Sequence, residues 1–366
     1  MPVIVHAATV EDRLSHYRRL RDFAATPEPS GSVPALPAPG GAPRFVVQQH
    51  DATRLHWDLR LEREGVLASW ALPRGFPWRP KENRLAVHTE DHPLDYLEFH
   101  GEIPAGQYGA GTMTIWDRGT YEAHTFAEDK VVVSLHGERV QGTYALFPIG
   151  EREWMIHRVD PPQDPHRRPV PDDLRPMVAV AGDLPSEAED WAFEVLWSGA
   201  RVLVTNDAGR ITLSDAQGRD VSEMFPELRR MGRSLGAVDV ILDGVVVAVD
   251  ARGQPLADAA NVERRLASRD ERQARRLAED RPVAAMLFDL LWLEGHPTTD
   301  LTYIDRRSLL SDLELAGPAW QTPANHRGDG EALLQVARAQ GLRGLVAKRL
   351  DSTYRPGETT TDWRVL

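Results

Sequence analysis

The most regular hydrophobic pattern in the first half of the chain is a strict alternation over residues 55–61. The apolar positions are Leu55, Trp57, Leu59 and Leu61. The polar positions between them are His56, Asp58 and Arg60. Side chains on a strand point to opposite faces with a period of two. The pattern therefore predicts a strand with one face in a core and the other carrying an imidazole, a carboxylate and a guanidinium.

Further short strands are expected on both sides of this one. They are predicted at residues 44–49, 69–72, 84–89, 96–101, 111–117, 121–126, 131–135, 142–147 and 154–159. Many short strands separated by Gly- and Pro-containing turns are typical of a small β-barrel or a sandwich. The glycines of the turn at 104–111 could cradle a phosphate, but no helix follows them, so a structural turn is the favoured interpretation.

The chain before the first strand divides into a helical and a flexible part. Residues 11–23 form a short basic segment in which Leu14, Tyr17 and Leu20 have helical spacing. Residues 30–43 are rich in Pro, Gly, Ala and Ser, which is typical of a flexible linker. We therefore expect a solvated basic arm over residues 1–43, followed by a β domain over residues 44–160.

The second half has a different character. Six prolines between residues 161 and 176 mark a domain boundary, and we expect a linker over residues 161–184. Strands are then predicted at 191–205, 210–214, 283–293 and 344–349, and residues 238–249 are predicted as a strand pair or one bent strand. Helices are predicted at 224–236, 261–280, 305–315 and 330–340. This mixture indicates an α+β domain over residues 185–366.

Composition narrows the class of protein. The 366 residues contain no cysteine, which suits a reducing cytoplasm, and no segment is typical of a signal peptide or a transmembrane span. We therefore expect a soluble intracellular protein. The net charge of -12 argues against a protein that coats DNA without specificity, although a local basic site would remain compatible with it. Ten of the 13 histidines fall within the first 160 residues, so candidate chemistry is concentrated there.

The polar face of the strand at 55–61 suggests such chemistry. His50, His56 and Asp58 are ligand types for a divalent transition metal such as Mn, Fe or Zn. Arg60 adds a cation that can hold a phosphate through two hydrogen bonds. A metal beside an arginine indicates phosphoryl chemistry. The alternative is an ordinary half-exposed strand whose outer face is charged.

A set of short stretches in the first half carries a more specific signal. These are RDF at 21–23 with TPEP at 26–29, QH at 49–50, LHWDLRLE at 55–62, SWALPRG at 69–75, RLAV at 84–87, EDHPLDY at 90–96, GQYGAGT at 106–112 and WDRG at 116–119. In this order they closely resemble the 3′-phosphoesterase module of the bacterial ATP-dependent DNA ligase D family.

The resemblance implies a small, mostly-β barrel with short helices and a divalent metal, usually manganese. The implied metal ligands are His50, His56 and Asp58. The residues implied at the scissile phosphate are Arg60 and His92, with Tyr96 nearby. Further implied substrate-binding residues are Arg21, Asp22, Glu28, Arg74 and Arg84. Members of the family remove a 3′-terminal ribonucleoside and then a 3′-phosphate to leave a 3′-hydroxyl, so the implied partners are DNA 3′ ends.

The residue chemistry is compatible with this reaction. A metal can activate water and orient a phosphate. Arg60 can neutralise charge on the equatorial oxygens, and His92 can protonate a leaving oxygen or stabilise charge. Tyr96 has an alternative interpretation as a core residue whose hydroxyl is satisfied by a neighbour. His88 and His100 flank the same region, and we interpret them as solvated or hydrogen-bonded.

The second half resembles another domain of the same family. The stretches are WAFEV at 191–195, LDGVV at 242–246, FDLL at 288–291, GLVAK at 344–348, YRPG at 354–357 and DW at 362–363. They are similar to the adenylation domain of ligase D, which implies an α+β nucleotidyltransferase-like fold. The family continues into an OB-fold domain beyond the point where this sequence stops, so we expect the domain without that OB-fold.

The departures from the family pattern predict an inactive ligase. Leu196 replaces the lysine of the K-x-D-G-x-R motif, so a covalent lysyl-AMP cannot form at this position. The other replaced positions are Ser198, Val245, Arg343 and Val365. The residues that match the pattern are Gly199, Arg201, Phe288 and Lys348, which favour a scaffold but leave a residual nucleotide pocket open. No ATP or AMP adduct is expected.

The sequence thus predicts a metal-dependent DNA 3′-end-healing phosphoesterase of the bacterial cytoplasm, most simply a manganese enzyme of end-joining repair, attached to a degenerate ligase domain. A separate repair polymerase, ligase or end-binding protein is the expected type of protein partner, by family analogy alone. The alternative is a non-catalytic DNA-end-binding or scaffold protein, in which both domains serve as modules.

Overall fold

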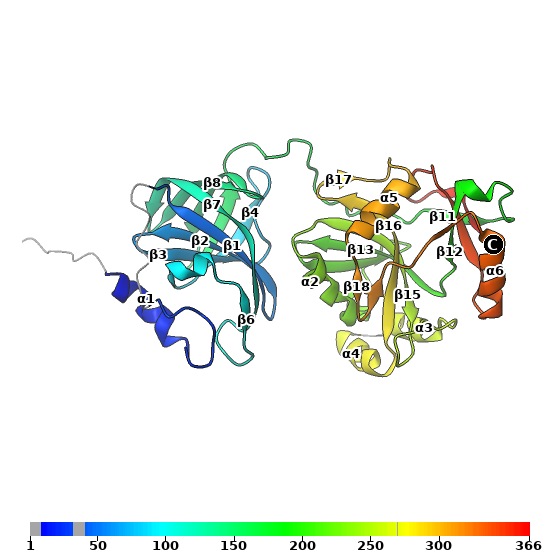
Figure 1. Cartoon of the computed structure of the whole chain (residues 1–366), viewed down its shortest axis with the longest axis horizontal. Helices are drawn as coiled ribbons and strands as arrows, with labels where there is room; N and C mark the ends of the chain where they lie inside the picture. The colour runs from blue at the N-terminus through cyan, green and yellow to red at the C-terminus, as the bar shows by residue number, and fades with distance from the viewer. Residues whose placement is uncertain (1–8, 32–40, 269) are drawn as a thin grey trace, which may run out of the picture. The chain divides into compact units, whose positions relative to one another are not determined.

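The structure is a computed structural model that describes residues 9–31, 41–268 and 270–366. The chain divides into two compact units, Met1–Pro165 and His166–Leu366, which are described separately below (Figure 1). Part of the predicted flexible linker, residues 32–40, lies outside the described residues.

The first unit is built around an antiparallel barrel. Its strands are β1 (Arg44–Asp51), β2 (Leu55–Arg63), β3 (Val66–Leu72), β4 (Asn83–His88), β5 (His92–Pro93), β6 (Gly101–Ile103), β7 (Gly111–Ala127), β8 (Lys130–Gly137), β9 (Gln141–Pro148) and β10 (Glu153–Arg158). The order β1-β2-β3-β4-β10-β9-β8-β7 closes on itself, because β7 pairs with β1 as well as with β8. The short strands β5 and β6 pair with β3 and β7. The prediction of a mostly-β barrel is confirmed.

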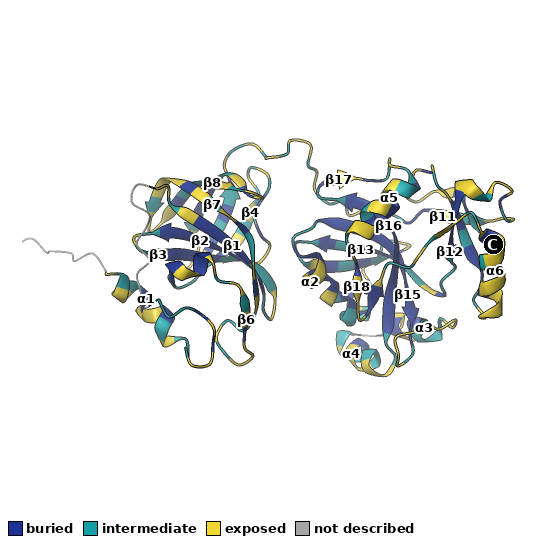
Figure 2. Ribbon diagram, viewed as in Figure 1, coloured by how far each residue is buried: buried dark blue, intermediate teal, exposed yellow. Residues whose placement is uncertain are grey.

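The polar face of β2 is buried, which differs from the half-exposed strand that the alternation alone would suggest. Trp57 and Leu59 are 1% and 0% exposed, as a core face requires, but Asp58 and Arg60 on the other face are only 6% and 2% exposed. Cross-strand partners share a face, and Gln48 of β1 lies opposite Asp58. Most of β1 and β2 is dark blue in Figure 2.

The cover over this polar face comes from helix α1 (Val10–Arg19) and the 3-10 helix η1 (Leu94–Leu97). Tyr17 of α1 packs in one cluster with Val46 of β1 and Tyr96 of η1. Leu14 and Tyr17 are buried, and burial of two such side chains stabilises the docked helix by about 1.5–3 kcal/mol each. Thr9 and Asp12 form a capping box at the start of α1. The expectation of a solvated arm was therefore wrong for this helix, because its apolar stripe has a docking surface.

Two element predictions in the first unit need correction. The expected strand at 96–101 is instead η1 followed by β6. Leu94, Tyr96 and Leu97 are all buried, which is the spacing of a helical turn and not of a strand. The two strands expected at 111–117 and 121–126 are one continuous strand, β7. Gly119 lies within this strand, where the backbone of His136 approaches too closely to leave room for a side chain.

The second unit contains two sheets flanked by helices. One sheet has the order β14-β13-β15-β16-β19-β18, with β17 paired to β16, and the other has the order β11-β22-β21-β12-β20. The strands are β11 (Val178–Ala181), β12 (Trp191–Val195), β13 (Gly199–Asp207), β14 (Arg210–Asp215), β15 (Val240–Ala248), β16 (Val283–Leu293), β17 (His296–Pro297), β18 (Ala316–Gly317), β19 (Trp320–Gln321), β20 (His326–Arg327), β21 (Leu345–Arg349) and β22 (Thr359–Val365).

Helices cover the outer side of each sheet of this unit. They are α2 (Met231–Leu235), α3 (Ala260–Leu266), α4 (Glu271–Asp280), α5 (Tyr303–Asp312) and α6 (Gly330–Ala339), with the 3-10 turns η2 (Ala188–Asp190), η3 (Ser222–Met224) and η4 (Pro226–Arg230). One core lies between the longer sheet and α2, α3 and α5, and a separate cluster packs α6 against the shorter sheet. A third cluster joins residues of β15 and β16 to Trp363 of β22.

Long predicted elements in this unit are divided in the structure. The strand expected at 191–205 is interrupted between β12 and β13, where Leu196 and Ser198 lie. The helix expected at 261–280 is two helices, because Asp270 accepts a hydrogen bond from the Gln273 backbone and caps a new helix. The helix expected at 224–236 is η3, η4 and the short helix α2. The α+β character is otherwise as predicted.

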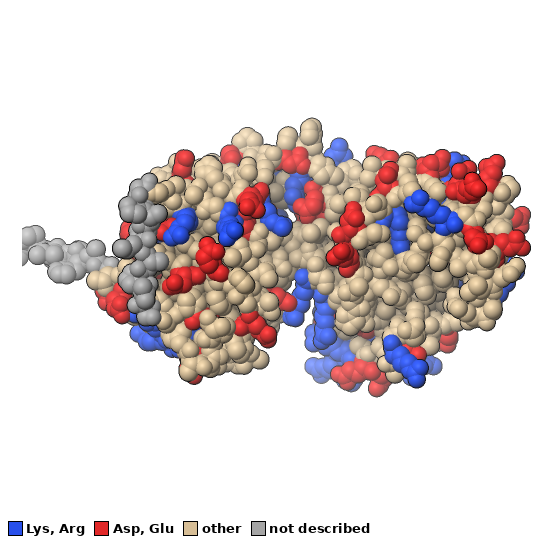
Figure 3. Space-filling view, in the orientation of Figure 1, with Lys and Arg blue, Asp and Glu red and all other residues tan. Residues whose placement is uncertain are grey.

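The proline-rich segment is not uniformly a linker. From His166 onward the chain belongs to the second unit: Arg168 donates its backbone N–H to the Gly295 carbonyl, and β11 pairs with β22. Among the described helices, none combines the length and the apolar character that a membrane span would need. On the face shown in Figure 3, acidic and basic side chains are interspersed, in keeping with the modest net charge.

Candidate metal centre and ligase-like pocket

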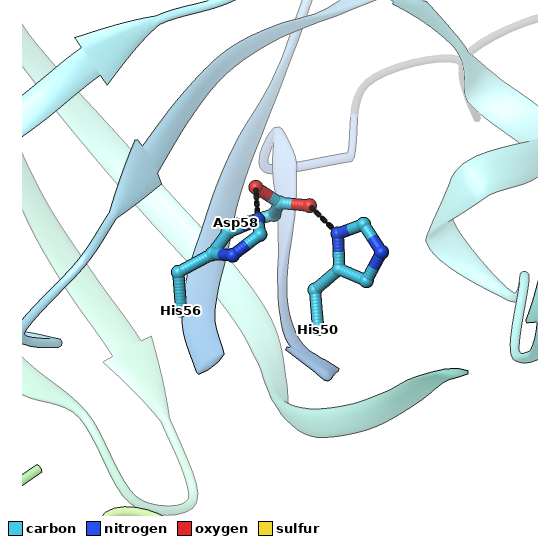
Figure 4. A group of neighbouring side chains, drawn as sticks. All are labelled: His50, His56 and Asp58. Atoms are coloured by element: carbon cyan, nitrogen blue, oxygen red, sulfur yellow. Dashed lines mark ion pairs between the residues drawn. The ribbon is translucent and has the colours of Figure 1, made fainter. Parts of the chain in front are cut away.

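The three predicted metal ligands lie together on the β1–β2 hairpin. His50 of β1 is directly opposite His56 of β2, and Asp58 follows on the same face. The Asp58 carboxylate lies 3.6 Å from Nδ1 of His50 and 3.5 Å from Nε2 of His56. The three ligand atoms all lie within 4.8 Å of one another. Figure 4 shows one imidazole turned toward each carboxylate oxygen.

Both imidazoles are held in the tautomer that leaves the correct lone pair free. His50 Nε2 lies 2.9 Å from the Gly109 carbonyl, and His56 Nδ1 lies 2.9 Å from the Arg54 carbonyl. A carbonyl can only accept, so each of these nitrogens carries the proton. The remaining nitrogens, Nδ1 of His50 and Nε2 of His56, face Asp58, so in the neutral form that a metal ligand requires they would direct their lone pairs toward the same point as the carboxylate. The donor set and its supporting contacts therefore fit a divalent metal.

Asp58 is ionised and fixed by Arg60. Burial acts to raise the pKa of Asp58, but Arg60 and the two imidazoles outweigh it and lower that pKa to about 2. Arg60 donates from Nη2 to Asp58 at 2.9 Å, from Nε to Gln48 at 2.6 Å and from Nη1 to Ser69 at 3.2 Å. The guanidinium is thus held rigidly beside the cluster, where its charge would meet a phosphate bound to the metal.

A buried network under α1 adjoins Arg60. Arg21 donates to Glu28 at 2.6 Å and to Glu90 at 3.0 Å, and its side chain is 4% exposed. Tyr96 donates its hydroxyl to Glu28, while the Arg60 guanidinium lies 4.7 Å from the centre of the Tyr96 ring. The hydroxyl of Tyr96 is therefore satisfied within the protein, and its ring supports Arg60.

His92 belongs to the same network. Arg21 donates to His92 Nε2 at 3.3 Å, so the imidazole proton resides on Nδ1. Burial lowers the pKa of His92 well below its usual range, and the charges of Arg60 and Arg21 lower it further. His92 is therefore a neutral imidazole at physiological pH. The ring centres of His92 and Tyr96 are 4.7 Å apart, which connects it to the Arg60 side of the site.

The structure places the other predicted substrate-binding residues differently. Asp22 is exposed and accepts from the Ala24 backbone in the turn after α1. Arg84 pairs with Glu82 at 2.8 Å and donates to the Arg74 carbonyl, and the Arg74 side chain is exposed. Arg21 and Glu28 thus lie in the network next to the cluster, whereas these three residues are held by local contacts of their own.

Three supporting residues were missed by sequence reasoning. Gln48 accepts from Arg60 and donates to the carbonyls of Tyr96 and Phe99, Ser69 accepts from Arg60, and Glu90 accepts from Arg21. Gln48 could have been found, because it lies two residues before His50 and so on the same strand face. Ser69 and Glu90 required the pairing of β3 with β2 and the docking of α1.

The second unit contains a cavity of about 580 Å³ at the positions that resemble an adenylation site. Leu196, Val245 and Val365, three of the replaced positions, line it together with Phe288 and Lys348. Ser198 is buried without lining the cavity, and Arg343 is exposed. The domain therefore contains a cavity as well as the expected scaffold. The cavity wall is largely apolar at the positions where the family pattern has charged groups.

Two of the cations that line this cavity, Lys348 and Arg201, are paired with carboxylates of the protein. Lys348 is 1% exposed, its Nζ lies 2.8 Å from Glu194, and the ring centres of Phe288 and Trp363 are 4.2 and 4.1 Å away. Burial lowers the pKa of Lys348, while Glu194 opposes that change. Arg201 makes a two-point ion pair with Asp243 at 2.5 and 2.6 Å. Each of these cations therefore has an internal counter-charge.

Comparison with known proteins agrees with this division. Residues 48–148 match the family described as DNA Ligase D 3′-phosphoesterase domain, and residues 176–364 match the family described as ATP dependent DNA ligase domain. The chain therefore belongs to the ATP-dependent DNA ligase family and combines its ligase domain with a ligase D phosphoesterase domain.

Individual relatives match nearly the whole of this chain with part of a longer protein. The multifunctional non-homologous end joining protein LigD of Mycolicibacterium smegmatis is 40% identical over 97% of this chain and 46% of its own length. The corresponding DNA repair protein of Mycobacterium tuberculosis is 41% identical over 97% of this chain and 45% of its own. The chain thus spans about half the length of these relatives. The solved ligase domain of M. tuberculosis LigD is 35% identical, covers 53% of this chain and 60% of that chain, and gives a TM-score of 0.46.

Proposed function

We propose that the first unit is a metal-dependent phosphoesterase that removes a 3′-phosphate, a 3′-terminal ribonucleoside or both from DNA, to leave a 3′-hydroxyl. The reaction would serve non-homologous end joining, the process named for the mycobacterial relatives. The single observation that carries this proposal is the cluster of His50, His56 and Asp58, with two fixed imidazole tautomers, an ionised carboxylate and Arg60 alongside.

A divalent metal bound by these ligands, most simply Mn²⁺, would supply an activated water and neutralise phosphate charge. Arg60 would hold an equatorial phosphate oxygen, because three hydrogen bonds already fix its guanidinium next to the ligands. His92 would act as a neutral group with its proton on Nδ1, which makes it a hydrogen-bond donor to charge that develops on the leaving oxygen. Arg21, Glu28 and Tyr96 would position these two residues.

For the second unit we propose a ligase domain that cannot form a covalent adenylate. Leu196 has no nucleophilic nitrogen, and Val245 and Val365 offer neither a metal ligand nor a cation to a triphosphate. Lys348 is a poor substitute nucleophile, because it is buried in an ion pair with Glu194 between aromatic rings. Docking to DNA or to another repair protein is the role we propose for this unit.

The reaction can be tested on a primer-template that ends in a 3′-phosphate or in one 3′-ribonucleotide. The full chain is incubated with manganese and the products are separated on a denaturing gel, beside His56→Ala. We expect metal-dependent dephosphorylation or shortening that the variant lacks. If both proteins leave the end unchanged while still binding DNA, the first unit is an end-binding module and the phosphoesterase proposal is wrong.

Partners and location follow from this proposal. The substrate is a DNA 3′ end, and because end joining also needs a polymerase and an active ligase, we propose, by family analogy alone, a repair polymerase or a ligase as the type of protein partner. The place of the reaction would be the bacterial cytoplasm, where the DNA lies. Labelled ATP with the purified chain and metal should give no radioactive protein band, and such a band would overturn the proposal of an inactive ligase.

A further inference from the structure

Tyr108 differs from every other Phe, Tyr and Trp side chain of the described residues in how far it is exposed. It is 43% exposed, whereas the other side chains of these three types are buried or half-buried. An exposed aromatic ring forgoes the stabilisation that its burial would give, so its position relative to the candidate site is informative.

The loop that carries Tyr108 is attached to the metal cluster. It joins β6 to β7, and the carbonyl of Gly109, the next residue, accepts the proton of His50 Nε2 at 2.9 Å. Gly106 and Gly109 have φ values of +89° and +74°, which favour glycine. At Gly111 a side chain would lie only 2.4 Å from the Asp51 carbonyl. The loop is therefore fixed against the β1–β2 hairpin, and it holds Tyr108 one residue away from a ligand contact.

Tyr108 also forms the exposed end of a column of stacked groups. The guanidinium carbon of Arg21 lies 3.9 Å from the ring centre of Tyr17 and 5.3 Å from that of Tyr108. Tyr17 is completely buried, and Arg21 is held by Glu28, Glu90 and His92. The column thus begins in the core, passes the network that positions His92, and ends in a ring that solvent can reach.

We propose that Tyr108 is a stacking platform for the nucleobase at the DNA 3′ end that enters the His50–His56–Asp58 cluster. The inference rests on the proposed phosphoesterase function of that cluster and adds a base-recognition element to it. A ring beside a phosphate-binding cluster can stack on a base while the metal and Arg60 hold the phosphate. Stacking of this kind tolerates any base, because every base has a π-face, so the platform selects for the presence of a base and not for its identity.

The test compares two primer-templates with a 3′-phosphate, one with a normal terminal nucleotide and one with an abasic terminal nucleotide. Tyr108→Ala, Tyr108→Phe and the exposed-residue control Ile149→Ala are assayed in the full chain with manganese. We expect Tyr108→Ala to raise KM about 10-fold on the normal end, with little change in kcat and no change on the abasic end. Tyr108→Phe and Ile149→Ala should behave as the unchanged protein.

A second readout separates this inference from the phosphoesterase proposal. The normal terminal base is replaced by 2-aminopurine, and its fluorescence is followed during titration with metal-free protein. Quenching that Tyr108→Ala loses and Tyr108→Phe retains would support stacking even if the chain processes no 3′ end. Equal quenching in all variants would overturn it, as would a KM increase of equal size on the normal and abasic ends.

Discussion

The candidate metal cluster of the first unit and the cavity of the second unit differ in what their polar side chains are bonded to. At the cluster, the backbone carbonyls of Gly109 and Arg54 occupy one nitrogen of each imidazole, and the other two nitrogens face the Asp58 carboxylate. At the cavity, Lys348 and Arg201 are neutralised by Glu194 and Asp243. Arg60 of the first unit is also paired, with Asp58, so the difference lies in the imidazoles: each has one ring nitrogen directed at a point that it shares with the Asp58 carboxylate.

The largest effect should come from breaking the cluster. His56→Ala removes one of three ligands, so we expect at least about a 100-fold loss of 3′-end processing with manganese. The gel assay measures this loss, and circular dichroism checks that the fold is intact. His136→Ala, which removes an exposed histidine of β8, is the matched control and should retain full activity. Equal activity of both variants would mean that the cluster is structural.

The buried network of Arg21, Glu28 and Tyr96 next to the cluster can be disrupted without changing the three candidate ligands. Glu28 is 4% exposed and accepts from Arg21, Thr26 and Tyr96, so Glu28→Gln leaves Arg21 with a single buried counter-charge, Glu90. We expect the free energy of unfolding to fall by about 3 kcal/mol, measured by urea denaturation of the first unit's transition. Glu102→Gln, on the exposed part of β6, should change it by less than about 0.5 kcal/mol. Similar values for the two variants would argue that α1 is not held by this network.

The pairing of Asp58 with Arg60 predicts a pH dependence of stability. Because the pKa of Asp58 is lowered to about 2 in the folded chain, its contribution is fully present above its unfolded pKa and is lost as the pH falls toward 2. The contribution is about 2 kcal/mol at pH 7, and about half remains at pH 3.

This dependence is measured on metal-free protein, as the difference in unfolding free energy between the unchanged chain and Asp58→Asn. The difference should shrink between pH 5 and pH 2.5. A difference that stays constant over this range would show that Asp58 is not ionised by its neighbours in the way the geometry implies.

The smallest effect is expected from restoring a single residue of the family pattern, the lysine at position 196, in the cavity of the second unit. Leu196→Lys restores a nitrogen, but Val245 and Val365 still provide no metal ligand or cation, so labelled ATP should give no covalent product. The fivefold variant Leu196→Lys, Ser198→Asp, Val245→Glu, Arg343→Glu and Val365→Lys is the sharper version and should give a detectable adduct. Adduct formation by Leu196→Lys alone would show that the cavity is one substitution away from activity, and the contrast between the two sites would then be much weaker.

Local patterns predicted the strands of the barrel and the ligand set. The alternation at 55–61 fixes which side chains share a face, and β2 begins at the same residue and ends two residues later, at Arg63. The same reasoning was wrong at 96–101, where three buried side chains satisfy a helical turn as well as a short strand. In the second unit, β16 was predicted with its observed bounds, because a long apolar run is compatible with few structures other than a buried strand. The helix expected at 261–280 was predicted as one element because its periodicity continues, but Asp270 caps a new helix within it.

The amino-acid sequence by itself determined the residue types of this protein's candidate chemistry: a histidine, an aspartate and an arginine on one face of the strand at 55–61, a second histidine shortly before that strand, and a leucine where a ligase needs lysine. Only the tertiary structure decided that α1 covers this face, that Gln48 and Ser69 hold Arg60, and that Arg21 sets the tautomer of His92. The physical reason is that strand periodicity assigns a side chain to a face, but the partner that desolvates it or fixes its proton comes from elements distant in sequence. Contacts of that kind are created by folding, and they turn the ligand types into a site.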